Sequence, residues 1–281
     1  MTATEAYLQD YVDHDGHRLG IHHYPDPAPD APVAVIWPAM GTPARFYRRF
    51  ARTLTEAGVA VIATDLRGTG SSTPAPSRAD TYGYADLAGD VDAVLDALRP
   101  HLQGRRYFLL GHSLGGQLCM IHLARHAREP GGPAGLILVA VGLPYYRAYP
   151  ARRYGTLAVT QGIGAVSALL GVWPGWGFGG RQARGVMTDW AYTARHGTFP
   201  ALHGAPVELG AISTPVLGIS VAHDAFTPAP VVDYTCSLLT GASVTRAHVE
   251  ADGIDHFGWA RSPDDVARHV VAFINPTPPS A

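Results

Sequence analysis

Hydrophobic residues along this chain follow two alternating spacings, one typical of buried strands and the other typical of amphipathic helices. Short continuous apolar runs, such as VAVIW at 33–37, predict strands that are buried on both faces, as in a parallel sheet. Such runs predict strands at residues 33–37, 59–64, 106–110, 135–141, 215–221 and 243–250. Helical spacing predicts helices at residues 44–57, 84–98, 114–127, 230–239 and 263–274. The alternation predicts an α/β fold with a mostly parallel central sheet and helices on both faces.

An antiparallel hairpin is predicted before the first of these strands. Residues 7–12 and 18–24 alternate between apolar and polar positions. The sequence DHDG at 13–16, which separates them, has the residues of a tight turn. We therefore expect the two segments to form an antiparallel edge of the sheet.

The alternation of strands and helices stops at residue 142 and resumes after residue 212. A segment of this length is too long for a plain loop. It predicts a cap, with helical pieces at 152–161 and 182–195, inserted into a core made of residues 1–141 and 213–281. The cap is rich in aromatic residues, which suits a pocket for an apolar or aromatic substrate. Four of them are candidate substrate contacts: Tyr145, Trp173, Trp176 and Trp190.

Composition and charge narrow the classes of partner. The chain has 281 residues, of which 47% are hydrophobic, enough for a sizeable core. Its 21 basic residues nearly balance its 23 acidic residues, and the sequence has no basic stripe, so we expect a small-molecule substrate and no nucleic acid. The chain starts without a secretory pattern and has no apolar stretch long enough to span a membrane, which predicts a cytoplasmic protein. The sequence leaves the oligomeric state open.

The cysteines and histidines do not predict a disulfide or a metal site. Cys119 and Cys236 each fall within a predicted helix, and we expect both to be buried free thiols. The chain has 14 histidines, but their spacing matches no metal-binding motif considered, so no metal and no cofactor are expected.

The sequence GHSLGG at 111–116 places a serine between glycines, directly after a predicted strand and before a predicted helix. A serine on so sharp a turn has strained backbone angles, and its neighbours two positions away approach other backbone closely. Gly111 and Gly115 provide the space that this turn needs. The pattern predicts a nucleophile elbow with Ser113 as the nucleophile. The alternative is a glycine turn with a solvated serine.

A serine nucleophile needs a general base, and the base needs a carboxylate to orient it. Asp224 follows the predicted strand at 215–221, where a carboxylate would reach the same edge of the sheet as Ser113. His256 lies in a loop before the last predicted helix, as a general base requires. We therefore predict Asp224 as the acid and His256 as the base. Asp255 is a rival acid.

Acyl transfer also needs N–H donors for the oxyanion that develops on the substrate. The elbow supplies one of them from the backbone of Leu114, the residue after the nucleophile. The second is expected from the loop after the strand at 33–37, where the sequence PAMG has small and flexible residues, and we assign it to Met40. The alternative is a tight connection that contributes no catalytic amide.

Three segments carry a resemblance to a known superfamily: GHSLGG at 111–116, DLRGTGSS at 65–72 and HFG at 256–258. They resemble the α/β-hydrolase superfamily, and the similarity covers almost the whole chain. Within it, PAMG at 38–41 together with FY at 46–47 resembles a little-characterised branch of bacterial serine hydrolases. Many relatives have His-Gly in place of the first two residues of PAMG, and many have glycine before the catalytic histidine.

These residues predict a serine hydrolase that cleaves an ester, a thioester or a lactone through an acyl-enzyme. Activated amides remain open as substrates. In the superfamily that this chain resembles, haloalkane dehalogenases and epoxide hydrolases use a carboxylate as the nucleophile at the elbow. A serine at that position therefore disfavours both chemistries. Two alternatives remain: an acyltransferase or cyclase that uses the same triad, and a hydrolase-like binding protein without turnover.

Overall fold

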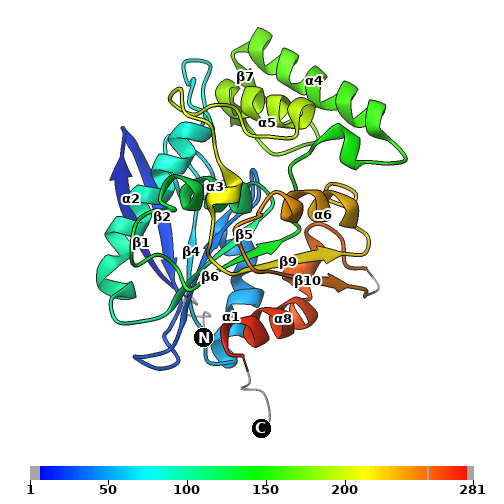
Figure 1. The fold of residues 1–281 in the computed structure, drawn as a ribbon. Coiled ribbons are helices and arrows are strands. Elements are labelled where there is room, and N and C mark those ends of the chain that lie inside the picture. The colour runs from blue at the N-terminus through cyan, green and yellow to red at the C-terminus, as the bar shows by residue number, and fades with distance from the viewer. Residues whose placement is uncertain (1–6, 252, 277–281) are drawn as a thin grey trace.

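The computed structural model describes residues 7–251 and 253–276 of the chain. Residues 1–6, which we expect to contain no secretory signal, lie outside this described part. The centre of the molecule is an eight-stranded sheet with the strand order β1-β2-β4-β3-β5-β6-β9-β10 (Figure 1). Its strands are β1 (Leu8–His14), β2 (His17–His23), β3 (Val33–Trp37), β4 (Ala60–Thr64), β5 (Tyr107–His112), β6 (Gly135–Val139), β9 (Val216–Val221) and β10 (Val244–Val249).

Parallel pairing dominates the sheet. Strand β3 pairs in parallel with β4 and β5, β6 pairs in parallel with β5 and β9, and β10 joins β9 in the same way. Strands β1 and β2 form an antiparallel hairpin in which His14 faces His17, and β2 runs antiparallel to β4. Every residue of β3, β4, β6 and β9 is buried, because helices cover both faces of the sheet. The predicted α/β fold class is confirmed.

Two groups of helices cover the two faces. Outside residues 142–212 they are η1 (Ala44–Tyr47), α1 (Arg48–Glu56), α2 (Tyr84–Leu102), α3 (Leu114–Arg125), α6 (Ala229–Ser237), α7 (Gly258–Arg261) and α8 (Asp264–Ile274). Helices α2 and α3 pack together, and α1 packs with α7 and α8. Each group has its own hydrophobic cluster, one around Leu118 and the other around Phe50 and Trp259. Burial of these clusters fixes the ends of the central strands relative to one another.

The helices differ from the predictions in their bounds, and one short helix, α7, was not predicted. The helix predicted at 44–57 begins as a 3-10 turn, and the backbone N–H of Ala44 donates to the Asp65 carboxylate at 2.6 Å. Helix α2 continues to Leu102 although Pro100 lies within it. A proline removes one hydrogen bond, and in the last turns the buried side chains of Leu98 and Leu102 hold the helix in place. Helix α7 is too short to give a periodic signal.

Residues 142–212 contain two α-helices, two short 3-10 helices and two short strands. They are η2 (Tyr146–Ala148), α4 (Arg153–Leu170), β7 (Val172–Trp173), β8 (Gln182–Ala183), α5 (Arg184–His196) and η3 (Leu209–Ala211). Helices α4 and α5 pack against each other above one end of the sheet (Figure 1). Helix α4 is longer than the predicted piece at 152–161. Within the described residues, no helix is both long and apolar enough to cross a bilayer.

Candidate active site

Ser113 lies on the turn between β5 and α3, where its backbone has φ 51° and ψ −118°. A positive φ is costly for a residue with a Cβ atom, and such strain persists only where the surrounding structure holds it. The turn places Ser113 on the wall of a cavity of about 740 Å³. Ser113 therefore has the strained backbone of a nucleophile elbow.

The glycines around Ser113 are required by close packing. A Cβ atom on Gly111 would lie 2.1 Å from the Cα of Gly116, and one on Gly115 would lie 2.1 Å from the carbonyl oxygen of Trp37. Both distances are far shorter than a van der Waals contact, so any larger residue would push α3 away from β3 and β5. The two glycines thus have the steric role that the sequence predicts.

Asp224 and His256 come together from two loops that follow neighbouring strands, β9 and β10. The Nδ1 atom of His256 lies 2.7 Å from the Oδ2 atom of Asp224. Each of the two residues is only 4% exposed, and His256 lines the same cavity as Ser113. Because the carboxylate occupies Nδ1, the Nε2 atom of His256 is the one left for proton transfer.

Asp224 is held in place by three hydrogen bonds in addition to that with His256. Its Oδ1 atom accepts the backbone N–H groups of Phe226 at 2.7 Å and of Thr227 at 2.8 Å, and its Oδ2 atom accepts the Thr227 hydroxyl at 2.6 Å. Burial alone would raise the pKa of Asp224, but the hydrogen bonds from His256 and Thr227 outweigh it and lower the pKa. The carboxylate is therefore ionised when it faces His256. Thr227 was not predicted from the sequence, although it lies three residues after Asp224 in a turn.

Asp255, the rival acid, faces a different group. Its Oδ1 atom accepts the backbone N–H groups of Phe257 at 3.0 Å and of Gly258 at 2.6 Å, at the start of α7. An aspartate in this position caps the free N–H groups at the N-terminus of a helix. The geometry therefore favours Asp224 over Asp255 as the partner of His256.

Met40 and Leu114, the two candidate oxyanion donors, both line the cavity beside Ser113. Leu114 is the first residue of α3, and the first N–H groups of a helix have no carbonyl partner within it. Gly41 has φ 68°, and a Cβ atom there would lie 2.3 Å from the carbonyl oxygen of Gly179. A Cβ atom on Gly179 would in turn lie 2.6 Å from the sulfur of Met40. The glycine-rich segment of residues 142–212 therefore packs directly on the loop after β3.

A buried tyrosine connects this loop to the residue before the nucleophile. The Tyr47 hydroxyl accepts the backbone N–H of Ala39 at 2.9 Å and lies 2.8 Å from the Nδ1 atom of His112. The His112 ring lies 4.7 Å from that of His256, centroid to centroid. Burial, followed by the charge of His256, lowers the pKa of His112 well below its usual value, so the ring is neutral. The hydrogen bond between the Tyr47 hydroxyl and Nδ1 of His112 ties the loop after β3 to the elbow.

Aromatic side chains from residues 142–212 form much of the cavity wall. Three of the four candidate substrate contacts, Trp173, Trp176 and Trp190, line it. Tyr145 does not belong to this wall, because its ring packs on Tyr234 at a centroid distance of 5.0 Å. The wall also includes two further aromatic residues of this aromatic-rich segment, Tyr149 and Phe178. Four more residues of the wall were not predicted from the sequence: Gln117, Arg152, Phe226 and Phe257. Tyr149 lies only four residues after Tyr145, beyond the short turn η2.

The two cysteines, Cys119 and Cys236, are both buried and free, as predicted.

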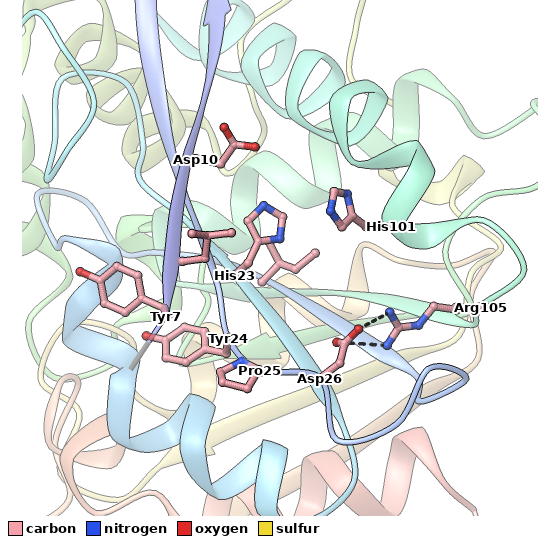
Figure 2. Close-up of a pocket in the computed structure, with 10 residues that line it drawn as sticks. Tyr7, Asp10, His23, Tyr24, Pro25, Asp26, His101 and Arg105 are labelled. Atoms are coloured by element: carbon pink, nitrogen blue, oxygen red, sulfur yellow. Dashed lines mark hydrogen bonds and ion pairs between the residues drawn. The ribbon is translucent and has the colours of Figure 1, made fainter. Parts of the chain in front are cut away.

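A second hollow, of about 630 Å³, lies against β1 and β2 (Figure 2). There the Nη1 atom of Arg105 pairs with the Oδ2 atom of Asp26 at 3.0 Å. Burial, followed by the charge of His101, lowers the pKa of His23. The described residues that line this hollow include no serine, threonine or cysteine, so it offers no aliphatic hydroxyl or thiol nucleophile.

Sequence comparison connects the chain with hydrolases. Residues 28–195 match the family described as serine aminopeptidase, S33. The protein named "Putative carbamate hydrolase RutD" from Variovorax paradoxus is 38% identical over 119 residues. That match covers 42% of this chain and 41% of the relative, so the chain matches less than half of the relative's length.

Solved structures share the fold over nearly the whole chain. The enol-lactonase from Burkholderia xenovorans has a TM-score of 0.60 and 21% identity, covering 94% of this chain and 99% of that one. Est1E from Butyrivibrio proteoclasticus, solved with ferulic acid bound, has a TM-score of 0.65 and 17% identity, covering 94% of this chain and 97% of that one. At these identities the likeness shows the fold alone. The family match and the shared fold lead to one conclusion: the chain belongs to the serine aminopeptidase S33 family of the α/β-hydrolase superfamily.

Proposed function

We propose that this protein is a serine hydrolase that cleaves esters, thioesters or lactones of small apolar or aromatic acids. The observation that carries the proposal is the convergence of Ser113 and His256 on one cavity, with Asp224 2.7 Å behind the histidine. Residues 142–212 act as the cap over this cavity in the proposal, because their side chains supply much of its wall.

In the proposed mechanism, the Ser113 hydroxyl attacks the substrate carbonyl while the Nε2 atom of His256 takes its proton. Asp224 keeps the imidazole oriented and stabilises its positive charge. The N–H groups of Met40 and Leu114 donate to the oxyanion of the tetrahedral intermediate. His256 then protonates the leaving alcohol or thiol as the bond to it breaks. Water, deprotonated by the same histidine, attacks the acyl-enzyme and releases the acid and Ser113.

The charge of the cavity wall supports a substrate without an amino group near the scissile bond. An aminopeptidase must bind the substrate's terminal ammonium, and a buried ammonium needs a carboxylate partner. Among the described residues that line the cavity, none is aspartate or glutamate. The charged side chain on the wall is Arg152, which would repel an ammonium. We therefore infer a neutral acyl group, packed against the rings of Trp173 and Phe178, in place of an aminoacyl group.

A matched substrate panel tests this proposal. We expect p-nitrophenyl butyrate and p-nitrophenyl benzoate to be hydrolysed, with turnover abolished in the variant Ser113→Ala. Leucine p-nitroanilide, which carries a free ammonium, is expected to react poorly. A neutral carbamate belongs in the panel because of the name of the Variovorax paradoxus relative. A higher kcat/KM for the leucine substrate than for both esters would refute the inferred substrate class. Acylation of Ser113 without hydrolysis would favour acyl transfer or cyclisation.

A further inference from the structure

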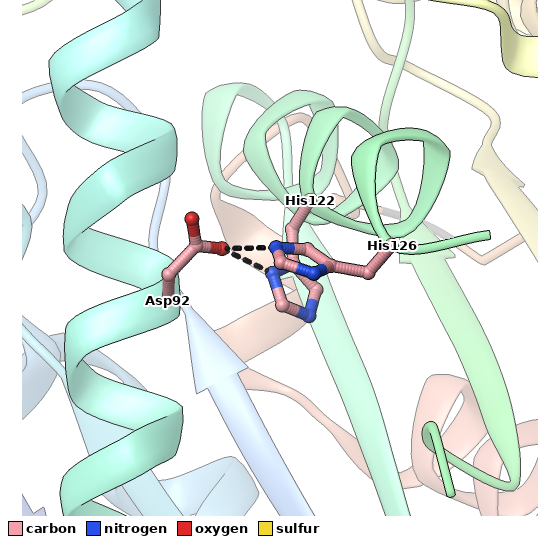
Figure 3. A group of neighbouring side chains, drawn as sticks. All are labelled: Asp92, His122 and His126. Atoms are coloured by element: carbon pink, nitrogen blue, oxygen red, sulfur yellow. Dashed lines mark hydrogen bonds and ion pairs between the residues drawn. The ribbon is translucent and has the colours of Figure 1, made fainter. Parts of the chain in front are cut away.

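Two histidines and an aspartate meet between α2 and α3, far along α3 from Ser113 (Figure 3). His122 lies in the last turn of α3, and His126 follows directly after the helix, four residues later and therefore on the same face. Asp92 faces them from α2. Its Oδ1 atom lies 2.6 Å from the Nδ1 atom of His122 and 3.1 Å from the Nε2 atom of His126. One oxygen and two imidazole nitrogens therefore point at a common centre.

The spacing of these three atoms is close to what a metal ion requires. The three ligand atoms lie within 4.8 Å of one another. In a tetrahedral zinc site with bonds of about 2.0–2.1 Å, ligand atoms are about 3.4 Å apart. To reach this spacing, the contact of Asp92 with His122 must lengthen by about 0.8 Å and the contact with His126 by about 0.3 Å. Rotation of the partly exposed His126 and Asp92 side chains allows this change.

Groups behind the ligands orient them as in metal sites. The Nδ1 atom of His126 lies 2.8 Å from the Glu129 carboxylate, which leaves Nε2 facing Asp92. A carboxylate behind a histidine in this way fixes the tautomer and makes the ligating nitrogen more basic. The second oxygen of Asp92 pairs with Arg125 at 3.1 Å, so the first remains directed at the two rings.

We propose that Asp92, His122 and His126 bind a divalent transition-metal ion of the Zn²⁺ class. Imidazole nitrogens favour Zn²⁺, Ni²⁺ and Co²⁺ over Mg²⁺ and Ca²⁺, which prefer sites made of oxygen atoms. The three ligands line a hollow of about 990 Å³ on the surface, so water has access to a fourth position. The ion links α2 to the end of α3, in a hollow separate from the cavity that Ser113 lines, and its role is to stabilise this helix pair.

This site is separate from the proposed catalytic residues and departs from the sequence expectation of no metal. His122 and His126 are spaced like a two-histidine helical site, but the third ligand is 30 residues away, counting from Asp92 to His122. Only the packing of α2 on α3 brings that ligand to the histidines.

Direct metal binding tests the proposal, with protein that carries no histidine tag. Titration with Zn²⁺ in the presence of a chromophoric chelator should give one site per chain, and Mg²⁺ should give none. Co²⁺ should produce the visible absorption bands of a site with four or five ligands. Zn²⁺ should also raise the Tm, because a ligand that binds only the folded state stabilises it.

Three variants test whether these residues bind the metal ion, and a fourth variant is the control. His122→Gln and His126→Gln should each weaken Zn²⁺ binding by about 10-fold or more, and Glu129→Gln, behind the ligands, should weaken it by about 10-fold. His196→Gln, which changes an exposed histidine on the cap, is the control and should bind as the parent does. The Tm of each variant without metal shows whether it is folded. Absence of a one-to-one site in the parent, or equal binding by the parent and a folded His126→Gln variant, would overturn the proposal.

Discussion

The strained backbone at Ser113 leads to a prediction about stability. Its angles, φ 51° and ψ −118°, lie outside the regions that residues with a Cβ atom readily adopt. The variants Ser113→Ala and Ser113→Gly both remove the hydroxyl, but only the glycine variant also removes the Cβ atom that causes the strain. Comparing the two variants therefore isolates the energy of the strain from the loss of the hydroxyl.

The expected difference follows from two opposing terms. Strain of this kind costs about 1–3 kcal/mol. Glycine loses more conformational entropy on folding than alanine does, which offsets about 0.5–1 kcal/mol of the strain relieved in the glycine variant. We therefore expect Ser113→Gly to be more stable than Ser113→Ala by about 1 kcal/mol, and its Tm to be higher by about 2–4 °C for a chain of this size.

Differential scanning calorimetry and urea unfolding of the two variants measure this difference directly. Neither variant should hydrolyse esters, so activity does not enter the comparison. A glycine variant that is no more stable than the alanine variant would show that the backbone at residue 113 is not strained in the way described.

Three further predictions concern the groups around the nucleophile. Tyr47→Phe leaves a buried N–H and a ring nitrogen without their partner, so it should destabilise the fold by about 2 kcal/mol. Its kcat should also fall by about 10-fold with little change in KM, whereas a purely structural role would leave kcat of the folded variant unchanged. Gly41→Ala places a Cβ atom against the Gly179 carbonyl at a positive φ; its unfolding free energy should fall by about 2 kcal/mol, and parental stability would contradict the close contact. The lowered pKa of Asp224 means that its pairing with His256 stabilises the protein above the unfolded pKa of about 3.9 and ceases to do so as pH falls through the folded value. The stability advantage of the parent over Asp224→Asn should therefore shrink between pH 5 and pH 3, and an advantage independent of pH would refute this reasoning.

Much of the fold could be predicted from the sequence because its signals are local. The strand VAVIW at 33–37 is observed at the predicted residues, since a short run of apolar residues buried on both faces has few alternatives. The serine turn could also be predicted, because its glycines are required by contacts within a few residues. Helix ends were less well predicted. Tertiary burial extends α2 past Pro100, which local propensity alone places near a helix end.

The parts that the sequence did not reveal depend on contacts between distant segments. Only the fold brings the hydroxyl of Tyr47 to His112 and to the loop after β3. The residues that line the cavity could not be predicted for the same reason. Aromatic content pointed to residues 142–212, but it could not separate Tyr149, which faces the cavity, from Tyr145, which packs elsewhere.

The most direct test of the proposed function is the mass of the intact protein after reaction with a fluorophosphonate. This reagent forms a stable bond only with an activated serine, and the activation is what the Ser113, His256 and Asp224 arrangement is proposed to supply. We expect one adduct per chain on the parent, none on Ser113→Ala and much slower labelling of His256→Ala. An unlabelled parent, or equal labelling of the parent and Ser113→Ala, would contradict the assignment of Ser113 as the nucleophile.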